Sequence, residues 1–332
     1  MRKPLTGWQK AGIFAGVGCL SIVALVVIAI SITVVWARST IANLGDPTPK
    51  RVERTIALQA PPAPAPDRAG ARNSTTTRTD PLRLSLDLEG GSFDIRPGPP
   101  GSDVQVQGTY AEGLFELAEN HETDESGRPR QTTIRFRSKV PGWARIFGGL
   151  GNDSGTRPNL TLLIPEGVPI DLSLRISAGE SRVDLGGLTL SELGLDLSMG
   201  DHRVDFRKPV VEGLRRVRLS ASMGNVSVEN FGNAGARTID ATGNMGNLTA
   251  DLGGAWQPGP EANLSFTHTM GEVTLRVPEK VRLETKIISQ GRTENGPTDT
   301  EKTNTEKTDD PKAPLLRLRV TTSMGDSHIV RY

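Results

Sequence analysis

A four-residue phrase that recurs along the chain constrains the fold more than any other feature of the sequence. Each copy joins two stretches in which apolar and polar residues alternate, and it begins with Ser, Thr or Asn, continues with Met-Gly and ends with Asp, Asn or Glu. The copies are Ser198-Met199-Gly200-Asp201, Ser222-Met223-Gly224-Asn225, Asn244-Met245-Gly246-Asn247, Thr269-Met270-Gly271-Glu272 and Ser323-Met324-Gly325-Asp326, with an earlier copy, Ser177-Ala178-Gly179-Glu180, that carries Ala in place of Met. Every methionine except Met1 lies in this phrase.

The spacing of the phrase predicts a stack of short units. The glycines of its first five copies, Gly179 to Gly271, recur at intervals of 21 to 25 residues, a period typical of stacked β units rather than of longer helical repeats. Alternation on both sides of each copy predicts strands with one apolar and one polar face. The sequence therefore predicts an all-β fold, a stacked single-stranded β-solenoid with coils of about 21–25 residues, preceded by one transmembrane α-helix.

The chemistry of the phrase suits a corner between two strands. Glycine adopts a positive φ without strain, and a neighbouring Asp or Asn can bond to its own local backbone. We therefore interpret these residues as structural turns: Gly179, Gly200, Asp201, Gly224, Asn225, Gly246, Asn247, Gly271, Glu272, Gly325 and Asp326. A calcium site in the acidic ladder is the lesser alternative, because each coil supplies only one such residue and calcium needs several converging oxygens.

Stacking would also align the methionines. Equivalent side chains of neighbouring coils lie ~4.8 Å apart, so the methionines form a ladder of their own. We expect them to fill gaps in the core at the corner. A redox or soft-metal methionine site is the lesser alternative.

The N-terminus predicts a membrane anchor. Residues 1–10 carry three basic residues and no acid, and residues 11–36 contain no charge, which is long enough for a spanning helix. We expect 1–10 to be a cytoplasmic tail and 11–36 a single-pass helix bracketed by Trp8 and Trp36, as interfacial anchors are. A cleaved signal peptide is the alternative. The only cysteine, Cys19, lies inside this segment, so the rest of the chain has no disulfide.

Composition divides the remainder of the chain. Residues 37–80 become rich in Pro and Thr and predict a disordered linker, after which 81–332 form the extracytoplasmic β-solenoid domain. Residues 289–314 hold almost no apolar side chain and predict a disordered polar insertion. Gly271 and Gly325 lie 54 residues apart, and removing the insertion leaves a length close to one coil.

Two further groups of residues are candidates for function. Trp143, Ile146 and Phe147 lie in a glycine-bounded loop that could contact a membrane or a partner, with ordinary loop packing as the alternative. The four histidines, His121, His202, His268 and His328, share no motif. We expect them to face solvent, although His202 and His328 follow equivalent corners and could approach one another.

Charge and motifs exclude several function classes. The net charge is +1, so nothing indicates nucleic-acid binding. The sequence has no nucleophile elbow, phosphate-binding glycine loop or zinc-ligand spacing. We predict no catalytic residue, no cofactor and no metal site.

Three stretches, Leu84 to Ile95 with Gly90-Gly91, 160–172 and 177–193, resemble the toast-rack and putative-adhesin type β-solenoid domains of bacterial envelope proteins. The resemblance covers about residues 82–332. It implies a stacked β fold, a bacterial origin and an association with envelope-stress sensing, and it offers no catalytic residue.

Together these features predict a non-enzymatic binding, adhesion or envelope-stress interaction module on the bacterial cytoplasmic membrane, with its C-terminal domain outside. Its expected partners are the membrane, another envelope protein or itself. Self-association would use the last strand, 327–332, because an unpaired strand edge can pair with another chain. The alternatives are a carbohydrate-active enzyme on a β-helix scaffold and a self-assembling structural envelope protein.

Overall fold

The computed structural model describes Ser31 and residues 48–58, 81–123, 129–140, 157–256, 261–293, 296–306 and 313–332. These residues form a fifteen-stranded sheet and one 3-10 helix. The elements in chain order are β1 (Lys50–Ile56), β2 (Leu82–Gly98), β3 (Val104–Tyr110), β4 (Phe115–Thr123), β5 (Pro129–Ser138), β6 (Asn159–Pro165), β7 (Ile170–Asp184), β8 (Leu190–Asp205), β9 (Arg216–Glu229), η1 (Phe231–Ala234), β10 (Thr238–Asp251), β11 (Ala262–Val277), β12 (Arg282–Thr293), β13 (Gly296–Glu306), β14 (Leu315–Ser323) and β15 (Gly325–Arg331).

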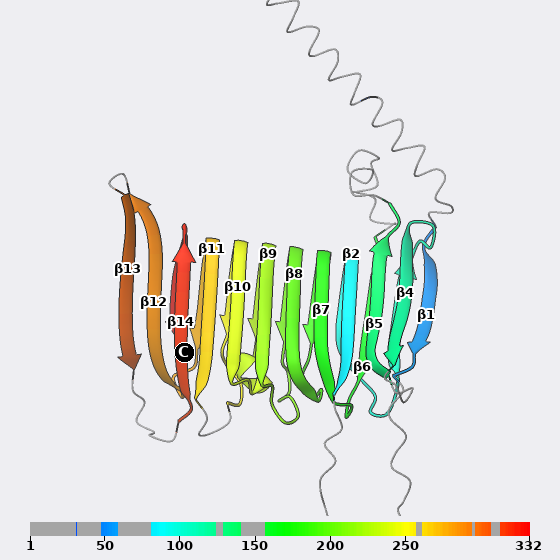
Figure 1. The fold of residues 1–332 in the computed structure, drawn as a ribbon, viewed down its shortest axis with the longest axis horizontal. Coiled ribbons are helices and arrows are strands. Elements are labelled where there is room, and N and C mark those ends of the chain that lie inside the picture. Colours follow the sequence, from blue (N-terminus) through cyan, green and yellow to red (C-terminus); the bar gives the residue numbers. More distant parts are fainter. Residues whose placement is uncertain are drawn as a thin grey trace, which may run out of the picture.

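The long strands β2 and β7 to β11 each bend at a glycine and contribute two arms to the stack (Figure 1). We call the part before the bend the first arm and the part after it the second arm; β14 and β15 are the two arms of the last coil. Neighbouring arms pair in parallel, and the bends align as Gly200↔Gly224↔Gly246↔Gly271. A turn then leads from each second arm to the next first arm. The predicted all-β, solenoid-like fold is confirmed for the described residues.

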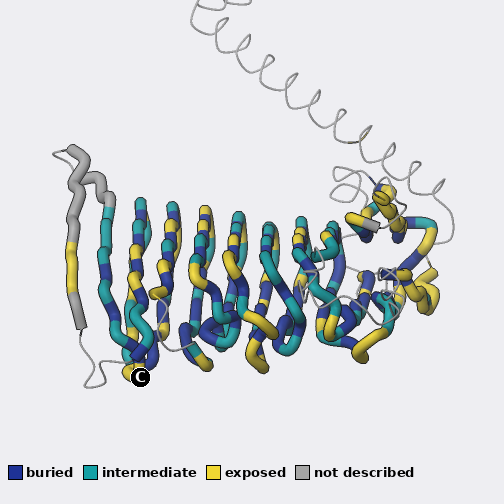
Figure 2. The backbone as a smooth tube through the Cα atoms, turned by 60° about the horizontal axis from the view of Figure 1, so that its bottom comes forward, coloured by how far each residue is buried: buried dark blue, intermediate teal, exposed yellow. Residues whose placement is uncertain are grey.

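The core lies between the two rows of arms. Alternate residues of each arm point inward, as Leu172, Leu174 and Ile176 do on the first arm of β7 and Val183 on its second arm. Buried and exposed positions therefore alternate along every coil (Figure 2). At the N-terminal end, an aromatic cluster built around the buried Phe136 lies in the core, with Tyr110 packed edge-on and Phe115 stacked.

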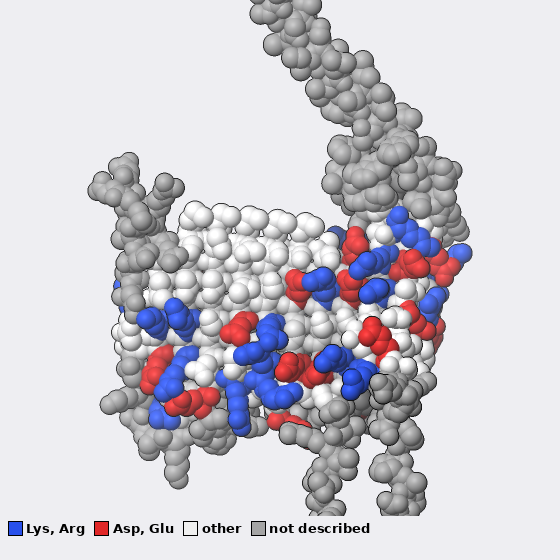
Figure 3. Space-filling model, in the orientation of Figure 1, with Lys and Arg blue, Asp and Glu red and all other residues white. Residues whose placement is uncertain are grey.

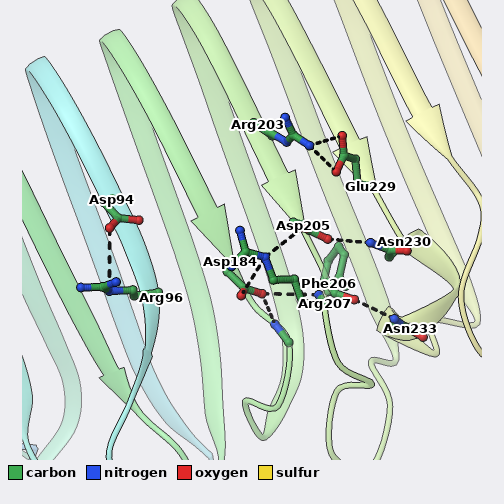
Figure 4. Close-up of polar contacts among 11 residues, drawn as sticks. Asp94, Arg96, Asp184, Arg203, Asp205, Phe206, Arg207, Glu229, Asn230 and Asn233 are labelled. Atoms are coloured by element: carbon green, nitrogen blue, oxygen red, sulfur yellow. Dashed lines mark hydrogen bonds and ion pairs between the residues drawn. The ribbon is translucent and has the colours of Figure 1, made fainter.

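The return turns are organised by polar side chains at the ends of the second arms (Figure 4). Asp184 Oδ1 accepts a hydrogen bond from the backbone N–H of Gly186 at 3.0 Å, and Asp251 Oδ1 accepts one from Gly253 at 2.8 Å. Such a side chain imitates a backbone turn. Asn230 Nδ2 donates to Asp205 Oδ1 at 2.8 Å, which ties two neighbouring coils together.

The N-terminal end of the stack begins earlier than the sequence predicts. β1 lies inside the segment 37–80, which we expected to be a disordered linker, and it pairs antiparallel with β3. The expectation was wrong for β1 because Val52 and Ile56 pack against the core and the strand covers an edge that β3 would otherwise expose. Residues 59–80 lie outside the described residues.

The C-terminal end also differs from the expected disordered insertion at 289–314. β12 and β13 form an antiparallel hairpin that includes much of this segment, and β14 inserts between β11 and β12. The polar sequence forms a strand because four residues of β13 are threonines, which favour β structure, and because it pairs with a backbone edge that would otherwise be open. A polar, charged outer strand is also a common way to protect a sheet edge.

The last strand, β15, pairs with β11 and ends the second-arm sheet. Tyr332 holds its end in place, since the hydroxyl donates to Asp251 Oδ1 at 2.6 Å and Arg276 lies over the ring at 4.9 Å. Burial and the hydrogen bond to Asp251 raise the pKa of Tyr332 to about 12.

Within the described residues, no helix is long and apolar enough to cross a membrane. The predicted anchor, 11–36, lies outside the described residues except for Ser31. The predicted contact loop with Trp143, Ile146 and Phe147 lies outside them as well.

Candidate functional site

The corner between the two arms is shaped by its glycines. Gly179, Gly200, Gly224, Gly246 and Gly271 have φ values of 127°, 132°, 126°, 110° and 119°. A Cβ on Gly246 would lie 1.9 Å from the carbonyl oxygen of Gly224 in the preceding coil. Glycine is thus required both for the positive φ and for the close approach of one coil to the next.

The corner is a bend inside a continuous strand rather than a separate tight turn, so the polar residues beside the glycines act differently from our interpretation. Asn225 Nδ2 donates to Asp201 Oδ1 of the preceding coil at 2.8 Å. Glu272 Oε1 accepts from Thr274 Oγ1 at 2.8 Å and lies 3.9 Å from His328 Nε2. Asp201, Asn225, Asn247, Glu272 and Asp326 are all exposed and form a row along the second-arm side of the corner.

The methionines of the phrase lie on the outside of this corner. Met199, Met223, Met245, Met270 and Met324 are 49%, 43%, 42%, 40% and 68% exposed. They occupy the same position in five successive coils, as the pairs Met199↔Met223, Met223↔Met245 and Met245↔Met270 show, and Gly271↔Gly325 places Met324 beside Met270. We call these five residues the methionine ridge.

The expectation that the methionines fill the core was wrong. The bend puts the residues on either side of the glycine on its convex side, so Met199 and Asp201 face outward, while Leu197 and His202 are the nearest inward positions. A signal for this exposure was present in the sequence. Two residues after each of these methionines stands Asp, Asn or Glu, where a continuing core-facing alternation would place an apolar residue.

The surroundings of the ridge on the first-arm side are uncharged. The residues that precede the methionines are Ser198, Ser222, Asn244, Thr269 and Ser323. In Figure 3, the upper part of this face over the central coils has no charged residue, and Lys, Arg, Asp and Glu gather on its lower half. The ridge is therefore an apolar row with a neutral polar flank on one side and an acidic and amide flank on the other.

Two histidines lie buried beneath the ridge. His202 and His268 are each 2% exposed, which corrects the expectation that they face solvent. His202 Nδ1 lies 2.9 Å from Ser181 Oγ, and its Nε2 has no hydrogen-bond partner. Burial lowers the pKa of His202, and the neighbouring Asp201 opposes that shift to a smaller extent.

His268 Nε2 lies 2.9 Å from the carbonyl oxygen of Gly246 and donates to it, while Nδ1 is buried without a partner. A Cβ at position 243 would lie 2.0 Å from that Nδ1, so Gly243 makes room for the ring. His328 is exposed on β15 and is separated from His202 on β8 by β9, β10 and β11. The suggested approach of His202 and His328 does not occur.

The outer face of the first arms carries a shallow groove of ≈ 570 Å³ that crosses β2 and β7 to β10. Its three carboxylates are each beside an arginine: Asp87 pairs with Arg137, Asp196 with Arg175 at 2.9 Å and Asp240 with Arg216 at 3.7 Å. A proton-donating carboxylic acid in a glycosidase instead needs an environment that keeps it protonated. The groove can therefore bind polar groups but offers no such acid.

Among the described residues, no group of three or more His, Cys, Asp or Glu side chains could hold a metal ion. The acidic row of the corner thus forms no cluster of that kind in the part of the chain that the structure covers.

Comparison with known proteins finds a match to one family model. Residues 65–229 match the family model of the N-terminal domain of toast_rack, DUF2154. A comparison with curated protein sequences finds no significant match.

Several solved structures are similar to this chain. A putative cell adhesion protein from Clostridium sporogenes aligns at 10% identity and a TM-score of 0.37, covering 86% of this chain and 100% of its own. A putative adhesin from Bacteroides fragilis aligns at 8% identity and a TM-score of 0.37, covering 86% and 97%. One from Parabacteroides distasonis aligns at 12% identity and a TM-score of 0.32, covering 87% and 98%.

Proposed function

Because residues 65–229 match the family model of the N-terminal domain of toast_rack, we propose that the protein is a non-catalytic interaction module of the bacterial cell envelope. Residues 11–36 hold it in the cytoplasmic membrane, with the β domain outside. The methionine ridge binds a segment of another envelope protein that combines apolar and basic side chains.

The observation that carries this proposal is the exposure of five methionines in register along one edge. Soluble proteins rarely leave large apolar side chains aligned in a row unless the row contacts something. Methionine is well suited to such contact because its unbranched, polarizable side chain adapts to different partners. The stacked coils beneath hold the row straight, so the ridge presents an extended surface, as other repeat proteins do.

Charge beside the ridge defines the chemistry of the partner. Asp201, Glu272 and Asp326 are exposed immediately after the corner glycines, and no lysine or arginine occurs in any copy of the phrase. This flank repels an anionic lipid surface and attracts lysine and arginine side chains. A basic amphipathic protein segment fits both the apolar row and its acidic flank.

Two features, the outer groove and the buried histidines, support a non-catalytic role. The groove's carboxylates are paired with arginines, and His202 and His268 lie inside the core, away from any substrate. An active site needs an acid, base or nucleophile that can reach a substrate.

In-cell crosslinking of the full-length protein tests the proposal. We expect crosslinks from the ridge to a partner segment that contains apolar and basic residues. The triple variant Met223→Ser, Met245→Ser, Met270→Ser should lose these crosslinks, because it removes the apolar row and keeps the surface polar. The control is Val211→Ser with Val330→Ser, since these valines are 47% and 48% exposed but lie off the ridge.

A charge variant tests the acidic flank separately. Asp201→Asn with Glu272→Gln and Asp326→Asn should weaken the crosslinks and reduce their sensitivity to salt, since screened charge pairs no longer contribute. Crosslinks that persist in the serine triple variant, or that join only copies of this protein, would overturn the proposal.

A further inference from the structure

We propose that neighbouring methionines of the ridge bind a soft monovalent metal ion, Cu(I), through their thioether sulfurs. This site is independent of the docking proposed above, because docking uses the apolar surface of the ridge and metal binding uses its sulfur atoms. Thioether and thiolate ligands select Cu(I) over harder ions.

The spacing of the ridge suits shared coordination. Side chains at equivalent positions of paired strands lie ~4.8 Å apart, which is close to twice a metal–sulfur bond of ~2.3 Å. Met223, Met245 and Met270 are consecutive. Three rotatable bonds let each side chain turn its sulfur toward a neighbour. Two or three thioethers can therefore converge on one ion.

The backbone under these residues is held before any ion arrives. Each methionine is followed by a corner glycine that aligns with the glycines of the next coils. The residues before the methionines are small or short and polar, and the methionine side chains are half exposed. The Cα atoms of the ligands are thus already fixed, and binding has to order only the side chains. This lowers the entropic cost of binding.

The electrostatics of the corner favour a cation but not a hard one. Asp201, Glu272 and Asp326 give the second-arm flank a negative charge. Each coil contributes at most one such side chain, since Asn225 and Asn247 are uncharged, and the described residues form no cluster of three or more His, Cys, Asp or Glu ligands. The negative flank therefore attracts cations in general, and the thioethers decide which ion stays.

A thioether does not take up a proton in the physiological pH range, whereas cysteine and histidine ligands must be deprotonated to bind a metal. Binding at the ridge should therefore persist at about pH 5, where an imidazole site is largely lost. This distinguishes the ridge from a site built on histidine side chains.

The test is a titration of the full-length protein in detergent with Ag(I), a redox-stable substitute for Cu(I), following the ε-methyl signals of labelled methionine. Cys19→Ser removes the only thiol. Met1 lies outside the phrase and serves as an internal reference for an isolated thioether. We expect the ridge methyl signals to shift together, at lower Ag(I) concentration than Met1, at about pH 7 and about pH 5 alike.

Two leucine variants make the test specific, since leucine keeps the volume and apolarity of methionine but has no sulfur. Met223→Leu with Met245→Leu and Met270→Leu leaves no two ridge methionines adjacent, and should weaken Ag(I) binding by about tenfold or more. Met199→Leu with Met324→Leu keeps three adjacent and should bind nearly as the wild type does. The leucine triple variant should retain the docking crosslinks, so failure of one proposal is distinguishable from failure of the other.

The proposal is overturned if the ridge signals shift only at the Ag(I) concentration at which the Met1 signal shifts. It is also overturned if both leucine variants lose binding equally, or if binding disappears at about pH 5. A thermal melt of each variant checks that the fold is kept. A competition with a Cu(I) chelator under reducing conditions then repeats the comparison with the proposed ion itself.

Discussion

At the scale of single residues, the corner places a glycine, an exposed apolar side chain and a buried polar side chain within a few residues of one another. Glycine admits the close contact between coils, the methionine before it is turned to solvent, and two residues after Gly200 the chain buries the polar ring of His202. Burying a polar group without a partner is costly, and His202 Nε2 has none. His202 is therefore the residue at which acid should first weaken this corner.

We predict that His202→Val removes part of the loss of stability in acid. The folded-state pKa of His202 lies below its unfolded value, so the unfolded chain binds more protons below about pH 6.5. Stability is then fully present above that pH and falls as pH decreases toward the folded-state pKa. Valine fits because Val226 occupies the paired position in the next coil.

Thermal melts of wild type and variant between about pH 7.5 and about pH 5 measure the effect, and the difference between the two curves isolates His202 from other titrating groups. The two proteins should diverge as pH falls, with the variant losing less. Parallel curves would contradict the assignment. Ser181→Ala is a useful companion, since it removes the hydroxyl that lies 2.9 Å from His202 Nδ1.

At the scale of elements, the two ends of the stack are protected by different strands. β13 closes the first-arm sheet at the C-terminal end, and β1 closes the second-arm sheet at the N-terminal end. β1 carries exposed Arg51, Glu53 and Arg54 on a short strand. Charged, short edge strands prevent sheets from pairing with other chains.

We predict that removing β1 makes the β domain associate. A protein beginning at residue 59 would expose the edge of β3 and lose the buried Ile56 and Leu58, whose burial contributes roughly 1.5–3 kcal/mol each. Light scattering after size exclusion should show concentration-dependent oligomers that a protein spanning 48–332 does not form. Adding Gln105→Lys and Gln107→Lys should restore the monomer, because lysine blunts an open edge. A monomeric truncated protein at every concentration would contradict the role assigned to β1.

At the scale of the whole molecule, the described coils form a one-dimensional stack in which strand pairing joins each coil to its neighbours, and the bond from Tyr332 to Asp251 reaches one coil further. In such arrays, stability is close to a sum of unit and nearest-neighbour terms. A destabilising substitution in a central coil should therefore lower the stability of the coils on both sides of it. A destabilising substitution in the last coil should affect only that end of the stack. The exposed ridge runs along five coils, so its straightness depends on the central coils being intact.

We predict this contrast for two glycine substitutions. In Gly246→Ala the new Cβ lies 1.9 Å from Gly224 O and φ is 110°, and in Gly325→Ala it lies 2.2 Å from Gly271 O. Gly246→Ala should lower the free energy of unfolding by roughly 2–4 kcal/mol and reduce hydrogen-exchange protection in β9 to β11. The terminal change should release mainly β15. Gly194→Ala is the control, because its Cβ would come no closer than 4.0 Å to Leu172 O. Equal loss of protection throughout in both variants would contradict the nearest-neighbour description.

The sequence determined the repeating unit of this protein. Its alternation, its period and the recurrence of Met-Gly at one position predict an all-β stack and even the pairing of Met223 with Met245, because a regular stack brings equivalent positions together. The corner glycines could be predicted from local chemistry alone, because few other residues tolerate a positive φ.

Tertiary structure alone decided which side of the chain faces water at the corner. Period-two alternation assigns faces only while a strand runs straight, and the bend at each glycine puts Met199 and Asp201 outside and His202 inside. Tertiary structure also decided that β1 and β13 are strands, because each has too few apolar residues to predict a strand and forms one beside an open backbone edge. The coil is a local property of the sequence, whereas the ridge and the ends of the stack exist only after the coils pack together.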